Sequence, residues 1–296
     1  MMRGKRLSDY LVEIAGGMIL LLTMIFCLFP FLLMISSSLT SEASLIRDGY
    51  GLIPREFSLA AYEYLVRELG TIGHAYGITL LVTAVGVTAS LVMTLLLGYV
   101  MARKTFPFRK FLTVYVLLTM LFNGGLVPTY LIYTQMFHIR DTLGALIVPN
   151  LLLSGFNVIL VKNYFASTIP EEIYEAAELD ADNELKIFWY VALPMSKPIV
   201  ATVGLFTMLN YWNDWLNGLY YVNEPQLFSI QNLLNRILND MNYLQSGEML
   251  MDVGYVLPSM SIRMAIALIS LLPVVLIFPI FQKYFVKGIT FGAVKG

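Results

Sequence analysis

The sequence has very little of the chemistry that enzymes and metal-binding proteins use. Its 296 residues include one cysteine, Cys27, and two histidines, His74 and His138. One cysteine permits neither a disulfide within the chain nor a cysteine metal site. The motifs of a phosphate-binding loop, a zinc protease and a serine hydrolase are absent from the sequence. We therefore expect no catalytic residue, no metal site and no cofactor in this chain.

Charge is also scarce. Only 13% of the residues are charged and 58% are hydrophobic, whereas charged residues make up about a quarter of an ordinary soluble domain. The net charge is −1, and no basic cluster with interleaved aromatic residues indicates binding to nucleic acid. This composition predicts a membrane protein that lies in a lipid bilayer.

Six apolar segments are candidate membrane-spanning helices, because about 20 apolar residues are needed to cross a bilayer. The sequence thus predicts an all-α membrane protein in which residues 1–296 form a single domain. Gly77, Gly86 and Gly98 are expected to allow close helix contacts, which would place the second span inside the bundle. We predict spans at about residues 12–38, 74–102, 110–132, 142–165, 198–222 and 261–285.

The basic residues predict the orientation of these spans. Most of the 19 Lys and Arg residues fall on the same side as the N-terminus. Lys and Arg are enriched in cytoplasmic loops. Both termini and the loop 168–197 are therefore expected to be cytoplasmic, in a cell membrane that the chain crosses several times.

Residues 168–197 are the one long charged segment between two apolar runs. Thr168 and Glu171 have the spacing of a capping box, and Pro170 suits the first turn of a helix that begins there. Asp182 and Asn183 favour caps and turns, so we expect a bend near them.

After this bend we expect a second short helix. Leu185, Phe188 and Trp189 would lie on its apolar side. The predicted helix extends from Glu184 to Ala192 and is ended by Pro194.

Two motifs in this loop resemble those of a known family. Glu175-Ala176-Ala177, followed at the family's spacing by Val191-Ala192-Leu193-Pro194, resembles the cytoplasmic EAA loop of bacterial ABC importer permeases. The wider stretch EAAELDADNELKIFWYVALP and the C-terminal tail are similar to the carbohydrate-uptake branch, to the second permease subunit of maltose-type systems. An amphipathic interfacial helix without a partner is the alternative interpretation.

The chain departs from this family at one position. The family's glycine after EAA is replaced by Ala181. The bend that a glycine would make at positive φ must therefore be made otherwise, and we expect Asn183 in the left-handed conformation.

The resemblance implies a six-span type I ABC importer transmembrane domain with cytoplasmic coupling helices and no ATPase of its own. The partners would be a homologous permease in a heterodimer, an ATPase dimer that binds ATP and Mg²⁺, an extracytoplasmic solute-binding protein, and a sugar, which we expect to be an oligosaccharide. The Glu175 carboxylate would meet an arginine of the ATPase, and the tail residues Lys295 and Gly296 would also contact it. The ATPase-coupling residues would be Glu175, Ala176, Ala177, Asp180, Ala181, Leu193 and Pro194.

Polar residues within the predicted spans are candidates for the substrate pathway. Polar groups in a membrane are costly and tend to face the bundle interior or a water-filled path, and tryptophan rings can stack on sugars. Asparagines also join helices, and tryptophans also lie at membrane interfaces, so both interpretations stay open. The candidates are Asn150, Asn157, Asn210, Trp212, Asn213, Asp214 and Trp215.

Two other functions remain as alternatives. A permease for amino acids or another polar solute would share the EAA loop. A secondary transporter or channel would be favoured by an inverted repeat or by an ionisable residue in the middle of a span, and the sequence shows neither clearly.

Overall fold

A computed structural model describes residues 7–180, 182–246 and 260–293 of the chain. These residues are mostly helical, and an isolated antiparallel bridge joins Thr40 to Phe57. They form two compact units, the first drawn from residues 1–70 and 236–271 and the second from residues 71–235 and 272–296. The all-α prediction is confirmed for the described residues.

The first unit contains α1 (Leu7–Ser38), α2 (Glu42–Asp48), α3 (Ala60–Arg67) and the start of α15 (Met260–Ala293). The Ser38 hydroxyl lies 2.9 Å from the Tyr62 hydroxyl, which ties α1 to α3. The Glu42 carboxylate accepts hydrogen bonds from the backbone N–H groups of Met260 and Ser261 at 2.9 and 3.1 Å. A carboxylate at this position complements the positive end of the α15 dipole.

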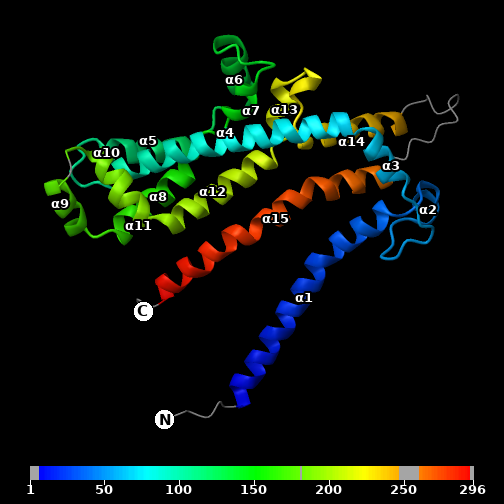
Figure 1. Cartoon of the computed structure of the whole chain (residues 1–296), viewed down its shortest axis with the longest axis horizontal. Helices are drawn as coiled ribbons and strands as arrows, with labels where there is room; N and C mark the ends of the chain where they lie inside the picture. The colour runs from blue at the N-terminus through cyan, green and yellow to red at the C-terminus, as the bar shows by residue number, and fades with distance from the viewer. Residues whose placement is uncertain (1–6, 181, 247–259, 294–296) are drawn as a thin grey trace. The chain divides into compact units, whose positions relative to one another are not determined.

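The long helices of the second unit run side by side (Figure 1). They are α4 (Leu69–Ala102), α5 (Arg109–Leu121), α8 (Gly155–Thr168) and α12 (Lys197–Trp212). At one end lie α9 (Glu171–Asp180), α10 (Glu184–Ile187), the π-helical turn η2 (Phe188–Ala192) and α11 (Leu193–Met195). Further along α4 lie α6 (Leu126–Leu131), α7 (Leu143–Ile147) and α13 (Leu216–Tyr221). The π-helical turn η1 (Ile132–Met136), the 3₁₀ turn η3 (Pro225–Leu227) and α14 (Ile230–Ser246) complete the helices.

Two glycines of α4 allow its neighbours to approach closely. A Cβ atom on Gly98 would lie 2.5 Å from Cγ1 of Val161 in α8, and one on Gly86 would lie 2.4 Å from the Tyr211 ring in α12. The predicted close contacts are therefore confirmed at Gly86 and Gly98. The expectation was wrong for Gly77, where an added Cβ would meet no atom within 4 Å.

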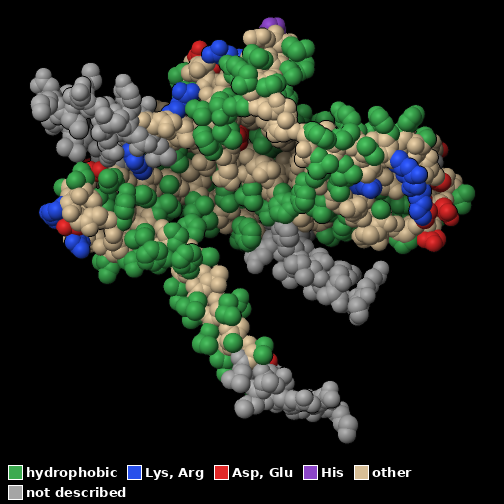
Figure 2. Space-filling view, turned by 180° about the vertical axis from the view of Figure 1, so that it is seen from behind, with side chains coloured by type: hydrophobic (Ala, Val, Ile, Leu, Met, Phe, Trp, Pro, Cys, Tyr) green, Lys and Arg blue, Asp and Glu red, His purple; other side chains and the backbone are tan. Residues whose placement is uncertain are grey.

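The described residues contain three helices that are long and apolar enough to cross a membrane, within α1, α4 and α15. Two bent helix pairs raise this number to five if each pair is one span. The first pair joins α5 to residues 126–136 at 114°, and the second joins residues 184–195 to α12 at 86°. Figure 2 shows hydrophobic side chains along the outside of the helices, where lipid or a partner subunit would cover them.

Three predicted spans are interrupted. The predicted span 110–132 breaks between α5 and α6, where Gly125 has φ of 86°. The predicted span 142–165 consists of α7 and α8, and Asn150, with φ of 60°, lies in the connection between them. The predicted span 198–222 is divided into α12 and α13. The positive φ of Gly125 and Asn150, together with Pro149, is incompatible with a continuous α-helix and accounts for the first two breaks.

Candidate functional site

Helices α9 to α11 form a bracket between α8 and α12, and we call residues 171–195 the bracket. Its bend lies at Asp182 and Asn183, as predicted. Asn183 has φ of −158°, and its side chain accepts a hydrogen bond from the backbone N–H of Lys186 at 2.9 Å. The expectation of a left-handed Asn183 was therefore wrong. Asn183 is in the extended conformation and caps the N-terminus of α10.

The predicted capping box is not formed. Thr168 is the last residue of α8, and the turn that starts α9 begins at Pro170, whose carbonyl accepts from the N–H of Ile173 at 3.2 Å. The Glu171 carboxylate instead lies 3.5 Å from Arg103 and 3.4 Å from Lys104. The ion pairs with these two cations replace the expected reciprocal cap.

The second helix of the bracket continues through Pro194, so the prediction that this proline ends it was wrong. The helix extends to Met195, and η2 precedes the proline. The N–H of Leu193 bonds the carbonyl of Phe188, which is a π-helical spacing. Proline lacks an N–H and clashes with the carbonyl four residues earlier, and the wider π turn accommodates it. The chain changes direction at Ser196.

A buried arginine joins the bracket to α4. The Arg103 side chain is 3% exposed, and its guanidinium contacts the carboxylates of Glu171 at 3.5 Å, Glu184 at 3.3 Å and Glu178. It also lies 4.3 Å from the centre of the Tyr174 ring. Burial lowers the pKa of Arg103, but the negative carboxylates and the other partners outweigh it and raise the pKa above its ordinary value. One cation thus holds both helices of the bracket.

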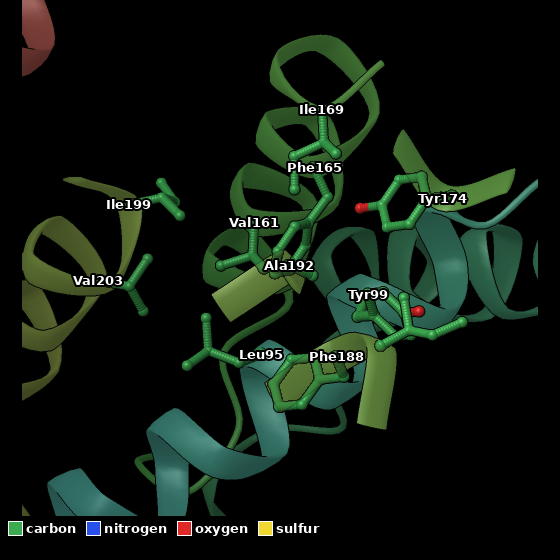
Figure 3. Packing of buried hydrophobic residues seen from close by; sticks show 11 residues of the cluster. Leu95, Tyr99, Val161, Phe165, Ile169, Tyr174, Phe188, Ala192, Ile199 and Val203 are labelled. Carbon is green, nitrogen blue, oxygen red and sulfur yellow. The ribbon is translucent and has the colours of Figure 1, made fainter. Parts of the chain in front are cut away.

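Tyr99, Phe165, Tyr174 and Phe188 form a buried aromatic cluster (Figure 3). The Tyr99 hydroxyl donates to the Glu184 carboxylate at 2.6 Å. The Tyr99 ring meets Phe165, Tyr174 and Phe188 edge-on, with centroids 5.8, 6.1 and 5.3 Å away. Ala192 and Ile199 extend this buried cluster toward α12. The inner face of the bracket is therefore attached to the ends of α4, α8 and α12.

Sequence reasoning missed Tyr99 and Arg103. Their spacing of four residues puts them on one face of a helix, and Arg103 is the first charge after the apolar run of α4. A basic residue at the end of an apolar run is also expected from membrane orientation alone, so its position does not reveal the ion cluster.

The outer face of the bracket carries the predicted coupling residues. Glu175 and Ala176 are exposed, and Glu175 has no ion pair or hydrogen bond to any described residue. Ala177 and Leu193 are half-buried against the aromatic cluster, and Pro194 is exposed.

Of the remaining predicted coupling residues, Asp180 ends α9, whereas Ala181, Lys295 and Gly296 lie outside the described residues.

The outer face of the bracket also carries large apolar side chains. Leu179 is 88% exposed and Tyr190 is 80% exposed. An apolar surface of this kind is typical of a protein-docking site.

The predicted pathway residues are divided between interior and surface. Trp212 is 1% exposed, and its ring lies 6.3 Å from that of Tyr76. Asn157 is buried and its Nδ2 donates to the Thr207 hydroxyl at 3.5 Å, which joins α8 to α12. The Asp214 carboxylate accepts from the N–H of Asn217 at 3.3 Å and so caps α13.

The other predicted pathway residues are exposed. Asn210 lies in the last turn of α12, Asn213 directly follows this helix, and Trp215 directly precedes α13. Asn150 is exposed in the connection between α7 and α8. Among the residues that the structure describes, no group of three or more His, Cys, Asp or Glu side chains could hold a metal ion.

Comparison with known proteins identifies the family. Residues 94–291 match the inner membrane component of binding-protein-dependent transport systems, and this match includes the whole bracket. The chain belongs to this family. It is therefore a membrane permease, a transport subunit.

Several relatives of the permease match along nearly its whole length. It is 35% identical to Protein LplC of Bacillus subtilis over 90% of this chain and 89% of the relative. It is 34% identical to the polygalacturonan/rhamnogalacturonan transport system permease protein YtcP of the same organism, over 98% of this chain and 99% of the relative. A solved bacterial ABC transporter involved in the import of the acidic polysaccharide alginate matches with a TM-score of 0.81 and 25% identity, over 96% of this chain and all of that chain.

Proposed function

We propose that the chain is one of two permease subunits of an ATP-driven importer of oligosaccharides. The observation that carries this proposal is the bracket, whose inner face is fixed to three helices while its outer face exposes large apolar side chains and Glu175. A docked ATPase would cover that outer face, with the Glu175 carboxylate opposite an arginine. ATP and Mg²⁺ would be bound by the ATPase.

The coupling follows from the way in which the bracket is held. The Arg103 ion cluster and the aromatic cluster connect both bracket helices to α4, α8 and α12. Closure of an ATPase dimer would therefore move the ends of these helices together as a rigid body, which is a common form of transition between two conformations. A homologous permease would supply the other half of the pathway.

Sugar as the substrate is supported by the names of the relatives. They include permeases for polygalacturonan or rhamnogalacturonan, for arabinooligosaccharides and for melibiose, raffinose and stachyose. The exposed Asn213 and Trp215 offer the amide groups and the flat ring that bind sugars. An extracytoplasmic solute-binding protein would deliver the sugar.

Uptake into vesicles tests this proposal. The assembled transporter, reconstituted with its solute-binding protein, should accumulate labelled oligosaccharides when ATP is enclosed with the ATPase. It should not do so when a non-hydrolysable ATP analogue replaces ATP. Accumulation of amino acids but not of oligosaccharides would contradict the proposed substrate, and accumulation without ATP would contradict the proposed energy source.

A further inference from the structure

A basic cavity of about 630 Å³ lies beside the bracket, between the α4–α5 connection, α5, α8 and the start of α9. Lys104, Arg109, Lys110 and Lys162 line it. Among the described residues around this cavity the one acid is Glu171, whose carboxylate already contacts Arg103 and Lys104. The cavity therefore has a net positive charge. Figure 2 shows basic side chains gathered beside acidic ones at this end of the unit.

Three of these four cations have no anionic partner in the part of the chain that the structure describes. Arg109, Lys110 and Lys162 form no ion pair with any residue that the structure describes. They come from two helices, α5 and α8, whose ends meet at the cavity. Like charges held close together repel one another, so an anion bound among them would stabilise the arrangement.

The surface next to the cavity is apolar. Phe111, Val114, Tyr115 and Leu118 are exposed along α5, and the Phe111 and Tyr115 rings stack with centroids 6.4 Å apart. Val114 lines the cavity as well, so the apolar surface begins where the basic cavity ends. A ligand that fits both parts has an anionic head and apolar tails.

We propose that this cavity binds the headgroup of an anionic phospholipid, with the acyl chains against the exposed face of α5. Basic pockets between membrane helices bind anionic headgroups by this chemistry. Inorganic phosphate would use the cations but not the apolar face. This lipid site is separate from the outer face of the bracket and goes beyond the proposed import function.

Lipid binding to the purified transporter tests the proposal. The full-length chain in the assembled transporter is delipidated in detergent and titrated with phosphatidylglycerol or with phosphatidylcholine of identical acyl chains. Bound lipids are counted by native mass spectrometry. The test variant is Arg109→Gln/Lys162→Gln, which removes one unpaired cation from each helix. The matched control is Arg67→Gln/Arg140→Gln, which removes two exposed charges elsewhere in the chain.

We expect the unsubstituted transporter and the control to bind phosphatidylglycerol in preference to phosphatidylcholine. The cavity variant should lose affinity for phosphatidylglycerol by about tenfold or more, because each cation near a membrane surface contributes separately. Its elution volume and thermal unfolding should match those of the control. If the double variant does not assemble, Lys110→Gln alone should lower the affinity about fivefold, because it removes one such cation.

Three results would overturn the proposal. Equal binding of phosphatidylglycerol by the cavity variant and the control would show that the lipid binds elsewhere. Displacement of the lipid by millimolar inorganic phosphate would show that the cavity is a site for a soluble anion. Stronger lipid binding after removal of the ATPase would show that the cavity belongs to the protein interface.

Discussion

Arg103 is the residue on which the attachment of the bracket most depends. Its guanidinium contacts carboxylates that follow 68, 75 and 81 positions later in the chain. The sequence alone could not reveal this cluster, because it carries no sign of which acids return to the end of α4. The exposed Glu175 could be predicted, since a local motif marks it.

Replacement of Arg103 should detach the bracket from α4. Arg103→Met leaves three carboxylates close together without their cation, and because water partly solvates these carboxylates the cost should lie below the roughly 3–5 kcal/mol of a fully buried ion pair. We expect a lower temperature of thermal unfolding and loss of the ATPase during purification. The matched control is the neighbouring Lys104→Met, which removes one exposed ion pair worth at most about 1 kcal/mol. Equal effects of the two substitutions would contradict the role of Arg103.

Asn183 should stabilise the bracket, because its side chain caps the N-terminus of α10. Asn183→Ala removes the bond to the N–H of Lys186 and should lower the stability of the bracket by about 1 kcal/mol, whereas Asn183→Asp keeps an acceptor. Co-purification of the ATPase should therefore decrease for the alanine variant and be retained for the aspartate variant. If Asn183→Gly proved more stable than both, a positive φ at this position would be favoured and the extended cap would be refuted.

At the scale of elements, the second unit depends on close contacts of α4. Gly98→Ala would place a methyl group 2.5 Å from Val161, and overpacking of this kind costs about 1–3 kcal/mol. We expect Gly98→Ala to lower the unfolding temperature. Gly77→Ala should leave the unfolding temperature unchanged, because the added methyl meets no atom within 4 Å. Similar unfolding temperatures for the two variants would show that α8 can move away from α4.

The apolar runs of α1, α4 and α15 could be predicted from the sequence, and the structure has a long helix at each. Helix ends and breaks were harder to predict. Pro194 was expected to end a helix, but the π turn before it accommodates the proline, and such a turn depends on the packing of Phe188 and Ala192. Residues 142–165 are apolar enough for one span, yet Pro149 and Asn150, which adopts a positive φ, separate α7 from α8.

At the scale of the whole molecule, the predicted pathway residues at the end of α12 and just after it divide into a structural part and an exposed part. Trp212 is fully buried, and truncation of such a residue costs about 3–5 kcal/mol. Trp212→Ala should therefore impair assembly of the transporter. Asn213→Ala and Trp215→Ala should give intact complexes with basal ATP hydrolysis and reduced uptake.

Two comparisons check this division, gel filtration for assembly and vesicle uptake for transport. An interhelical hydrogen bond contributes only about 0.6 kcal/mol on average, which is too little to hold a heterodimer together. Normal uptake by Trp215→Ala would remove that residue from the pathway. Dissociation of the Asn213→Ala complex would assign Asn213 to helix packing instead.

The central claim is that the outer face of the bracket couples this permease to an ATPase through Glu175. The most direct test is ATP hydrolysis by the assembled transporter, measured with and without the sugar-loaded binding protein, for Glu175→Lys and for the exposed control Glu63→Lys. We predict that Glu63→Lys keeps the stimulation by substrate and that Glu175→Lys loses most of it while the chain still inserts in the membrane. Full stimulation in the Glu175→Lys transporter would contradict the account.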